Sequence, residues 1–397
     1  MEQVTLSSES GVEPLRLRRF IEVSVLTGSA LILLLLGNVW WDERLLVSGV
    51  PLNPLLAIVT LLLLVAAPPE RNTVRLLTLM ILPLLVIVPS ILWSLDAEYG
   101  ATKVGNLVIV SFLSTALLIS AAQRHSWLLV QQLIVLALLV LLILAFGFKL
   151  RFGLFDRGVP FLFNGPIVFA RVMALAAIFS MFVFRGLLRV CLVTAFSLAV
   201  VWTASKGPVL AMLATYGFVG WRTLRLPSRL LLSGVVVAGI AGVLTTGGIE
   251  SYAGDNRLIL FMKVLLGGDT LLSEQGPLGA RLISFRETLV LIANRPFGAG
   301  LGGWAYAVSE NAGLVYPHNL VLELFSEAGI LAGAIALIPF TVFLLARFSS
   351  AWLAALFFLV AQMVSGDLLD ARYLVVTSIL AYWISREIEV ERFHTHR

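Results

Sequence analysis

The segment YPHNLVLELFSEAGILAG places His318 at the start of an apolar run. Pro317 suits the first turn of a helix, where its missing N–H leaves no bond unmade. Asn319, Glu323 and Glu327 follow at i, i+4 and i+8, so they share one face of the predicted helix. Lipid does not tolerate such a face, and we expect it to line a protein interior or a water-filled cavity. The imidazole can accept a proton near physiological pH, the alternative being a structural hydrogen bond.

A second group of residues could bind an anion. Its members are cations expected at or near the same membrane face as His318: Arg157, Arg171, Lys206, Arg281 and Arg286. Arg171 lies within the apolar run IVFARVMALAA, where an unpaired charge costs at least ~2.5 kcal/mol, so we expect a partner or a functional role. Lys206 lies at the tip of TASKGP, between two apolar runs. For a lone cation at a span end, such as Arg157, the alternative is an anchor that snorkels to water.

The composition identifies the chain as a polytopic integral membrane protein. Of its 397 residues, 59% are hydrophobic and 13% are charged, whereas about a quarter of a soluble domain is charged. The net charge of +5 therefore reports membrane topology and not nucleic-acid binding. The single cysteine, Cys191, excludes a disulfide framework and a cysteine-based metal site. The first apolar run has no cleavage signal, and we expect residues 1–397 to form one membrane domain.

Spans of about 20 apolar residues recur along the chain. Twelve segments qualify: 21–40, 49–68, 75–94, 104–122, 127–147, 166–184, 187–203, 207–221, 229–247, 319–345, 350–364 and 373–385. We therefore expect an all-α protein with about twelve transmembrane helices and one long loop, 248–318, that contains amphipathic helices.

The distribution of Lys and Arg predicts which side each loop occupies. Fifteen of the 28 basic residues fall in segments that alternation from a cytoplasmic N-terminus puts inside. The short outside loops carry only seven: Arg44, Lys103, Lys149, Arg151, Arg157, Lys206 and Arg372. Both termini are then cytoplasmic, and the loop 248–318 is periplasmic in a Gram-negative cell. His318 becomes the only one of the four histidines outside.

The end of this loop reads RLISFRETLVLIANRPFGAGLGGW. The pattern predicts an amphipathic helix with Arg281, Phe285 and Thr288 on one side and Leu289 on another, ended by Pro296. GAGLGG formally fits a dinucleotide-binding fingerprint, but no strand precedes it and no βαβ unit surrounds it. We expect its glycines to reverse the chain toward the membrane.

The chemistry that fits these residues is the handling of a lipid-linked phosphate or pyrophosphate. Arginines bind phosphates bidentately and stabilise developing negative charge, and a histidine deprotonates an attacking hydroxyl. The sequence has no cluster with metal-ligand spacing. Because no nucleotide is available outside the cell, group transfer there must draw on a lipid-activated donor.

HNLVLELFSEAGILAG resembles the signature of the bacterial O-antigen ligase and O-antigen polymerase superfamily. That signature is His-Asn, nine residues, Gly, two residues and a small residue, here His318, Asn319, Gly329 and Ala332. Ala332 departs from the usual Gly, Thr or Val.

Three upstream motifs extend the resemblance over about residues 160–345. ARLISFRETLVLIANRPFGAGLGGW resembles the family's arginine, amphipathic helix and Pro-x-x-G-x-G block, which assigns the functional arginine to Arg281. TASKGP resembles the Thr-x-Ser-(Arg/Lys)-Gly element, with Lys206 at its basic position. NGPIVFA resembles the Asn-x-Asn-x-x-Ala element imperfectly.

The resemblance implies a GT-C-like helical membrane fold and metal-independent glycan transfer without a cofactor. The donor would be glycan on undecaprenyl pyrophosphate, at the periplasmic face of the inner membrane. A polymerase moves the growing chain onto the next lipid-linked repeat unit, and a ligase moves it to lipid A–core. A chain-length regulator is a further candidate partner.

The resemblance also implies residue roles. His318 would be the base on the acceptor hydroxyl, and Arg281 and Lys206 would hold the pyrophosphate. Asn319 would orient His318 or the acceptor. Second-rank candidates for binding, from position, are Arg157, Arg171 and Arg286.

Polymerase and ligase both remain open from the sequence, and the loop favours polymerase. Only 36 residues separate Arg281 from His318, which leaves little chain for a platform that binds lipid A–core. A flippase or exporter of an anionic lipid is the alternative from another class. Transporters often contain inverted repeats with broken helices, and the sequence shows none.

Overall fold

The structure is a computed structural model that describes residues 12–36, 46–47, 50–154, 159–162, 165–203, 205–223, 277–308 and 314–395. This part of the chain is all-α apart from a two-residue antiparallel pairing, Leu46–Val47 with Val50–Pro51. The predicted span 229–247, residues 248–276 and 309–313 of the predicted loop 248–318, and Arg157 lie outside the described residues.

The described helices fall into two sets, one before residue 224 and one after residue 276. The first set is α1 (Val12–Leu36), α2 (Leu52–Ala66), α3 (Arg71–Ile81), η4 (Leu82–Trp93), α4 (Ala97–Val104), η5 (Gly105–Val110), α5 (Ser111–Arg124), α6 (Trp127–Phe152), α7 (Pro166–Val183), α8 (Gly186–Trp202) and α9 (Lys206–Thr223). The second set is α13 (Pro277–Asn294), α14 (Trp304–Ala307), α15 (Leu320–Ala328), α16 (Ile330–Ala336), α17 (Ile338–Thr341), η7 (Val342–Leu345), α18 (Ser350–Ser365) and α19 (Arg372–Thr395).

Part of this set has the length and composition of membrane-spanning helices. Five helical segments of the described chain are long and apolar enough to cross a membrane: Leu17–Leu36, Arg71–Trp93, Ala97–Arg124, Trp127–Phe152 and Pro166–Val183. Four further apolar helices are shorter: Leu55–Ala66, Gly186–Trp202, Ile330–Leu345 and Ser350–Ser365. The structure thus supports a multi-pass membrane protein, and the count of twelve spans stays a prediction.

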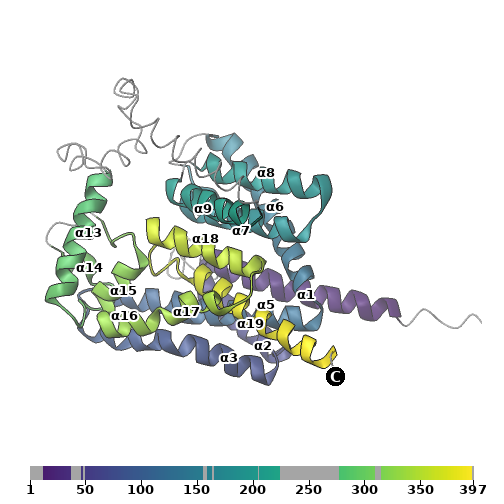
Figure 1. Ribbon diagram of the computed structural model, residues 1–397, viewed down its shortest axis with the longest axis horizontal. Coiled ribbons are helices and arrows are strands. Elements are labelled where there is room, and N and C mark those ends of the chain that lie inside the picture. Colours follow the sequence, from purple (N-terminus) through teal and green to yellow (C-terminus); the bar gives the residue numbers. More distant parts are fainter. Residues whose placement is uncertain are drawn as a thin grey trace, which may run out of the picture.

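The long helices run side by side, and the elements that carry the predicted site gather at one end of them. Figure 1 shows α13, α14, α15 and α16 at the end opposite to the C-terminus of α19, with α13 crossing the bundle end. The helix α7 is buried on every side from Val168 to Ser180. A helix that is apolar all round is a core helix, and Arg171 lies inside this one.

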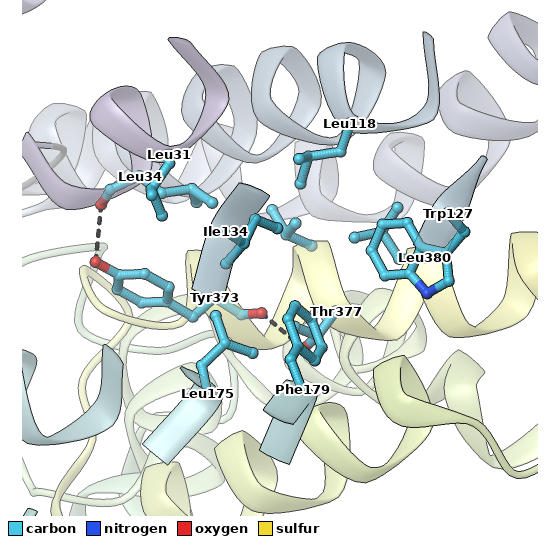
Figure 2. A pocket seen from close by; sticks show the side chains of 11 residues that line it. Leu31, Leu34, Leu118, Trp127, Ile134, Leu175, Phe179, Tyr373, Thr377 and Leu380 are labelled. Carbon is cyan, nitrogen blue, oxygen red and sulfur yellow. Dashed lines mark hydrogen bonds between the residues drawn. The ribbon is translucent and has the colours of Figure 1, made fainter. Parts of the chain in front are cut away.

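The core contains an apolar pocket between α1, α5, α6, α7 and α19 (Figure 2). Its lining is Leu31, Leu34, Leu118, Trp127, Ile134, Leu175, Phe179, Tyr373, Val376, Thr377 and Leu380. The Tyr373 hydroxyl donates to the Leu34 carbonyl at 2.9 Å, and the Thr377 hydroxyl donates to the Tyr373 carbonyl at 2.7 Å. Both hydroxyls are satisfied by backbone within the protein, so this pocket is part of the packed core and not a site for polar chemistry.

The predicted span 319–345 is wrong as a single helix. The chain is helical from Leu320 to Ala328 and again from Ile330, with Gly329 between them at φ +90°. The glycine-rich segment 296–303 packs against this break. Ile330 N donates to Pro296 O at 3.0 Å, and Gly300 N donates to Glu327 O at 2.9 Å. The predicted reversal of the chain at these glycines is confirmed in this form.

The helix α13 ends before Pro296 as predicted but starts at Pro277, four residues before Arg281, and burial does not divide its residues into the two predicted sides. Ser284 and Thr288 are buried, whereas Phe285, Leu289 and Val290 are exposed. The buried hydroxyl of Thr288 accepts a hydrogen bond from Trp304 Nε1 at 2.9 Å, which gives the polar face a partner inside the protein. Hydrophobic periodicity alone could not show this, because in a membrane protein the apolar face need not be the inner one.

Replacement of Gly329 by alanine tests the helix break. A Cβ there would lie 2.7 Å from Phe297 C and Pro296 O, at a φ that L residues rarely adopt. We expect Gly329→Ala to lower stability by about 1–3 kcal/mol, measured as a fall in the thermal unfolding midpoint in detergent.

Gly217→Ala in α9 is the matched control, since a Cβ there meets nothing within 4 Å. In a helix interior it should be neutral or stabilising by about 0.5–1 kcal/mol. Equal midpoints for the Gly329→Ala variant and the parent would contradict the broken-helix geometry.

Candidate functional site

His318 lies immediately before α15, in a backbone conformation that few non-glycine residues adopt. Its φ is +58°, in the left-handed region, where histidine is among the more tolerated side chains. Asn319, the next residue, is the N-cap of α15 and accepts hydrogen bonds from Val321 N and Leu322 N, both at 3.1 Å. This cap fixes the point at which α15 begins, and therefore the position of the His318 backbone just before it.

Asn319 also ties this point to another helix. Its Nδ2 donates to the Met363 carbonyl of α18 at 3.0 Å. The Asn319 side-chain oxygen therefore caps α15, and the Asn319 side-chain nitrogen attaches the start of α15 to α18. That Asn319 orients His318 or the acceptor stays a prediction.

The ring of His318 is half-buried and packs edge-on against Tyr316, with 4.4 Å between ring centroids. Its Nδ1 is buried and has no hydrogen-bond partner among the described residues. Burial, and then the positive charges of Arg281 and Arg171, lower the pKa of His318 to about 4. The imidazole is therefore neutral at physiological pH, which is the form that accepts a proton.

Arg171 is fully buried and paired, as the sequence predicted for a charge at this depth. Its Nη1 donates to Asp370 Oδ2 at 2.7 Å, and its Nη2 donates to the Ser365 carbonyl at 3.1 Å. Asp370 also meets Arg372 Nη1 at 3.4 Å. Two guanidinium groups thus share the Asp370 carboxylate.

The segment 363–371, which connects α18 to α19, collects most of these contacts. It supplies the carbonyls for Asn319 and Arg171 and the carboxylate of Asp370. Burial and neighbouring Asp370 raise the pKa of Asp367 in the same segment to about 6. The segment lies among the starts of α7, α9 and α15, which come from distant parts of the sequence.

The start of α9 reaches this segment too. Gly207 packs so closely against Ser365 that a Cβ would overlap the serine side chain. The start of α9 therefore lies next to Ser365, whose carbonyl binds Arg171, and the side chain of Lys206 lies outside the described part of the chain.

The predicted residues thus separate into two groups. His318, Asn319, Arg171 and Arg281 belong to one neighbourhood, the last because its charge acts on the pKa of His318. Arg286 is exposed on α13 and is not among the cations that shift this pKa, so the structure gives no support to grouping it with them.

The sequence analysis missed Lys103. It was predicted to lie in an outside loop, but the structure buries it in α4, where its Nζ pairs with Glu323 Oε1 at 2.5 Å and Glu327 Oε1 at 2.8 Å. The predicted polar face of α15 is confirmed as interior, because both glutamates are fully buried. Their spacing was the available signal, but it could not name a partner more than 200 positions away.

Arg372 is a second correction. A cation at a span end suggested an interfacial anchor, but Arg372 is fully buried. Its Nε donates to the Leu34 carbonyl at 2.9 Å and its Nη1 donates to the Leu369 carbonyl at 2.6 Å. It holds the 363–371 segment against α1.

The arrangement can do two things chemically. A neutral imidazole can take a proton, and the guanidinium groups around it can bind an anion and stabilise charge that develops nearby. No group of three or more His, Cys, Asp or Glu side chains with metal-binding geometry occurs within the described residues.

Comparison with known proteins bears on the same residues. Residues 190–337 match the sequence model of the family described as O-antigen ligase. The matched range includes Lys206, Arg281 and His318, and it confirms the resemblance to the O-antigen ligase and polymerase superfamily. No curated protein matches the chain significantly.

The pKa of His318 tests the electrostatics of the site. In a single-histidine variant (His125→Gln, His394→Gln, His396→Gln) with ¹³C-labelled histidine, NMR titration should give a pKa near 4. Adding Arg281→Gln should raise it by on the order of one unit, because removal of a nearby positive charge favours the imidazolium.

Arg286→Gln, on the exposed side of the same helix, is the control and should leave the value unchanged. A pKa near 6.5 in the parent variant, or equal shifts from both arginine substitutions, would contradict the geometry.

Proposed function

We propose that the protein is a glycosyltransferase that polymerises oligosaccharide repeat units carried on undecaprenyl pyrophosphate, as an O-antigen polymerase does. The observation that carries the proposal is a neutral, half-buried His318 whose pKa is lowered by burial and then by Arg281 and Arg171, in a chain whose residues 190–337 match the O-antigen ligase family. A base beside cationic groups is what transfer from a pyrophosphate donor requires.

The proposal includes a location. The site would face the periplasm from the inner membrane, within one membrane domain of about twelve spans, GT-C-like, with both termini cytoplasmic. The excess of Lys and Arg in the segments expected inside supports this orientation. The clustering of α13 to α16 at one end of the bundle agrees with a site at a single membrane face (Figure 1).

In the proposed reaction His318 acts on the acceptor. Its imidazole removes the proton of a sugar hydroxyl while that oxygen forms a bond to the anomeric carbon of the donor glycan. The bond between that carbon and the pyrophosphate oxygen breaks, and its electron pair stays with undecaprenyl pyrophosphate. The proton on His318 is then released to solvent. The step uses no metal and no cofactor.

The cations act on the donor in this proposal. Arg281 and Lys206 hold the pyrophosphate and stabilise the negative charge that grows on the leaving group. Arg171 is bonded to Asp370 and Ser365, so its contribution is to the field at His318 and at the bound anion, not to a free bidentate grip. Arg157 and Arg286 remain lower-ranking candidates for contacts with the glycan.

Ligation to lipid A–core is the second candidate, because the matching family is described as O-antigen ligase. We prefer polymerisation because the chain between Arg281 and His318 is short. The 36 residues from Arg281 to His318 include most of α13, the glycine-rich segment and α14. Little of that chain is left to bind a bulky lipid A–core acceptor.

Purified protein in detergent or nanodiscs, supplied with lipid-linked repeat units alone, tests the proposal. We expect a ladder of glycan products of increasing length on gels or by mass spectrometry. A single transfer that appears only when lipid A–core is added would replace polymerase by ligase, and no transfer to either acceptor would contradict both.

His318→Ala serves as the catalytic control for this assay. Loss of the base should lower the rate by about 10²- to 10⁴-fold while protein level and lipid-linked donor remain unchanged. Arg281→Lys should retain little activity, because the planar fork that matches a pyrophosphate is lost.

A further inference from the structure

Lys103 is one of the largest fully buried side chains of the described chain, and it is charged. Its Nζ lies between two carboxylates of α15, Glu323 and Glu327, and donates to both carboxylate oxygens of Glu327 at 2.8 Å. The Lys103 ammonium also lies 4.6 Å from the centre of the Tyr99 ring. We call Lys103, Glu323 and Glu327 the buried ion cluster.

Glu323 and Glu327 each also accept a hydrogen bond from the backbone of another segment. Glu327 Oε2 accepts a hydrogen bond from Gly302 N at 3.0 Å, which attaches the glycine-rich segment after α13. Glu323 Oε2 accepts from Leu368 N at 2.9 Å, which attaches the segment 363–371. The cluster therefore joins α4, α15, the glycine-rich segment and the 363–371 segment at one buried charge.

These are the segments that carry the candidate site. His318 precedes α15, Arg281 lies on α13 just before the glycine-rich segment, and Asp370 of the 363–371 segment binds Arg171. The position of His318 relative to both arginines therefore depends on how these segments are fixed to one another.

The helix α15 cannot fix His318 by itself. It has nine residues and ends at the Gly329 break, and isolated helices shorter than about 12–15 residues are marginal in water. Its first residue is held by the Asn319 cap and tether. The rest of its inner face is held by the two glutamates of the buried ion cluster.

We propose that Lys103, Glu323 and Glu327 are positioning residues for the transfer reaction, and that they hold His318 against Arg281 and Arg171. This inference rests on the proposed function. Apolar packing of similar volume can stabilise a core as well as a buried ion pair does, but it lacks directional bonds to particular backbone groups. The bonds to Gly302 N and Leu368 N are such directional contacts.

The test compares two variants of the single-histidine protein, each of which neutralises one ion group completely. The first is Lys103→Met with Glu323→Met and Glu327→Met, so that no buried charge is left without a partner and no side-chain oxygen remains to accept from Gly302 N and Leu368 N. The control is Arg124→Met with Glu22→Met, which removes a partly exposed ion pair of 3.2 Å. The measurements are the thermal midpoint, the NMR-titrated pKa of His318, and kcat and KM for glycan transfer.

We expect the buried-cluster variant to fold with a midpoint close to the parent. Its kcat should fall by about 10²-fold with KM for the donor little changed, because His318 is no longer aligned. The pKa of His318 should rise toward 6.5 as the histidine moves away from the arginines. The control should match the parent in all three measurements.

A folded buried-cluster variant with the parental pKa of His318 and parental kcat would overturn the proposal. If that variant does not fold, Glu327→Asp decides, since it keeps the charge and withdraws the carboxylate by one methylene. A parental pKa of His318 and parental kcat in Glu327→Asp would likewise overturn it. The pKa measurement needs no substrate, so it still tests the positioning role if the parent transfers no glycan and the proposed function fails.

Discussion

A lysine ammonium in the protein interior imposes the strictest constraint on this structure. Lys103 is 1% exposed, and a charge at that depth is tolerated only when it is paired and hydrogen-bonded. Two glutamates of α15 supply the pairing, and their remaining oxygens are bonded to backbone N–H groups of two other segments. One requirement, the satisfaction of a buried charge, thus fixes the relative positions of four segments distant in sequence.

The candidate site follows from that arrangement. The helix α15 is held in place by these contacts and ends at Gly329. Its first turn lies at one end of the bundle, and His318 precedes that turn in a left-handed conformation. Arg171 and Arg281 then lower the pKa of this histidine, with burial as the larger cause. The same cations that suit a pyrophosphate hold the imidazole in its neutral form and weaken it as a base, and a bound anion that offsets their charge would raise its pKa again.

Much of the fold class and part of the site could be predicted from the sequence. Apolar spans and an inward polar face on α15 follow from composition and periodicity. The predicted place of Pro317 in the first turn of this helix is wrong, because the helix begins at Leu320. The partner of that face could not be predicted, because Lys103 precedes Glu323 by more than 200 positions and charge counting assigns it to an outside loop. The burial of Arg372 could not be predicted either. A cation at the end of a span gives the same sequence pattern whether its side chain reaches out to water or packs inside the protein.

The most direct test of the central claim is a cryo-EM structure with a non-reactive donor analogue, a phosphonate mimic of the undecaprenyl-pyrophosphate-linked repeat unit. The account predicts pyrophosphate oxygens within about 3 Å of the Arg281 guanidinium and the anomeric carbon facing His318. A pyrophosphate bound away from Arg281, with His318 out of reach of the acceptor side even through one water, would contradict it.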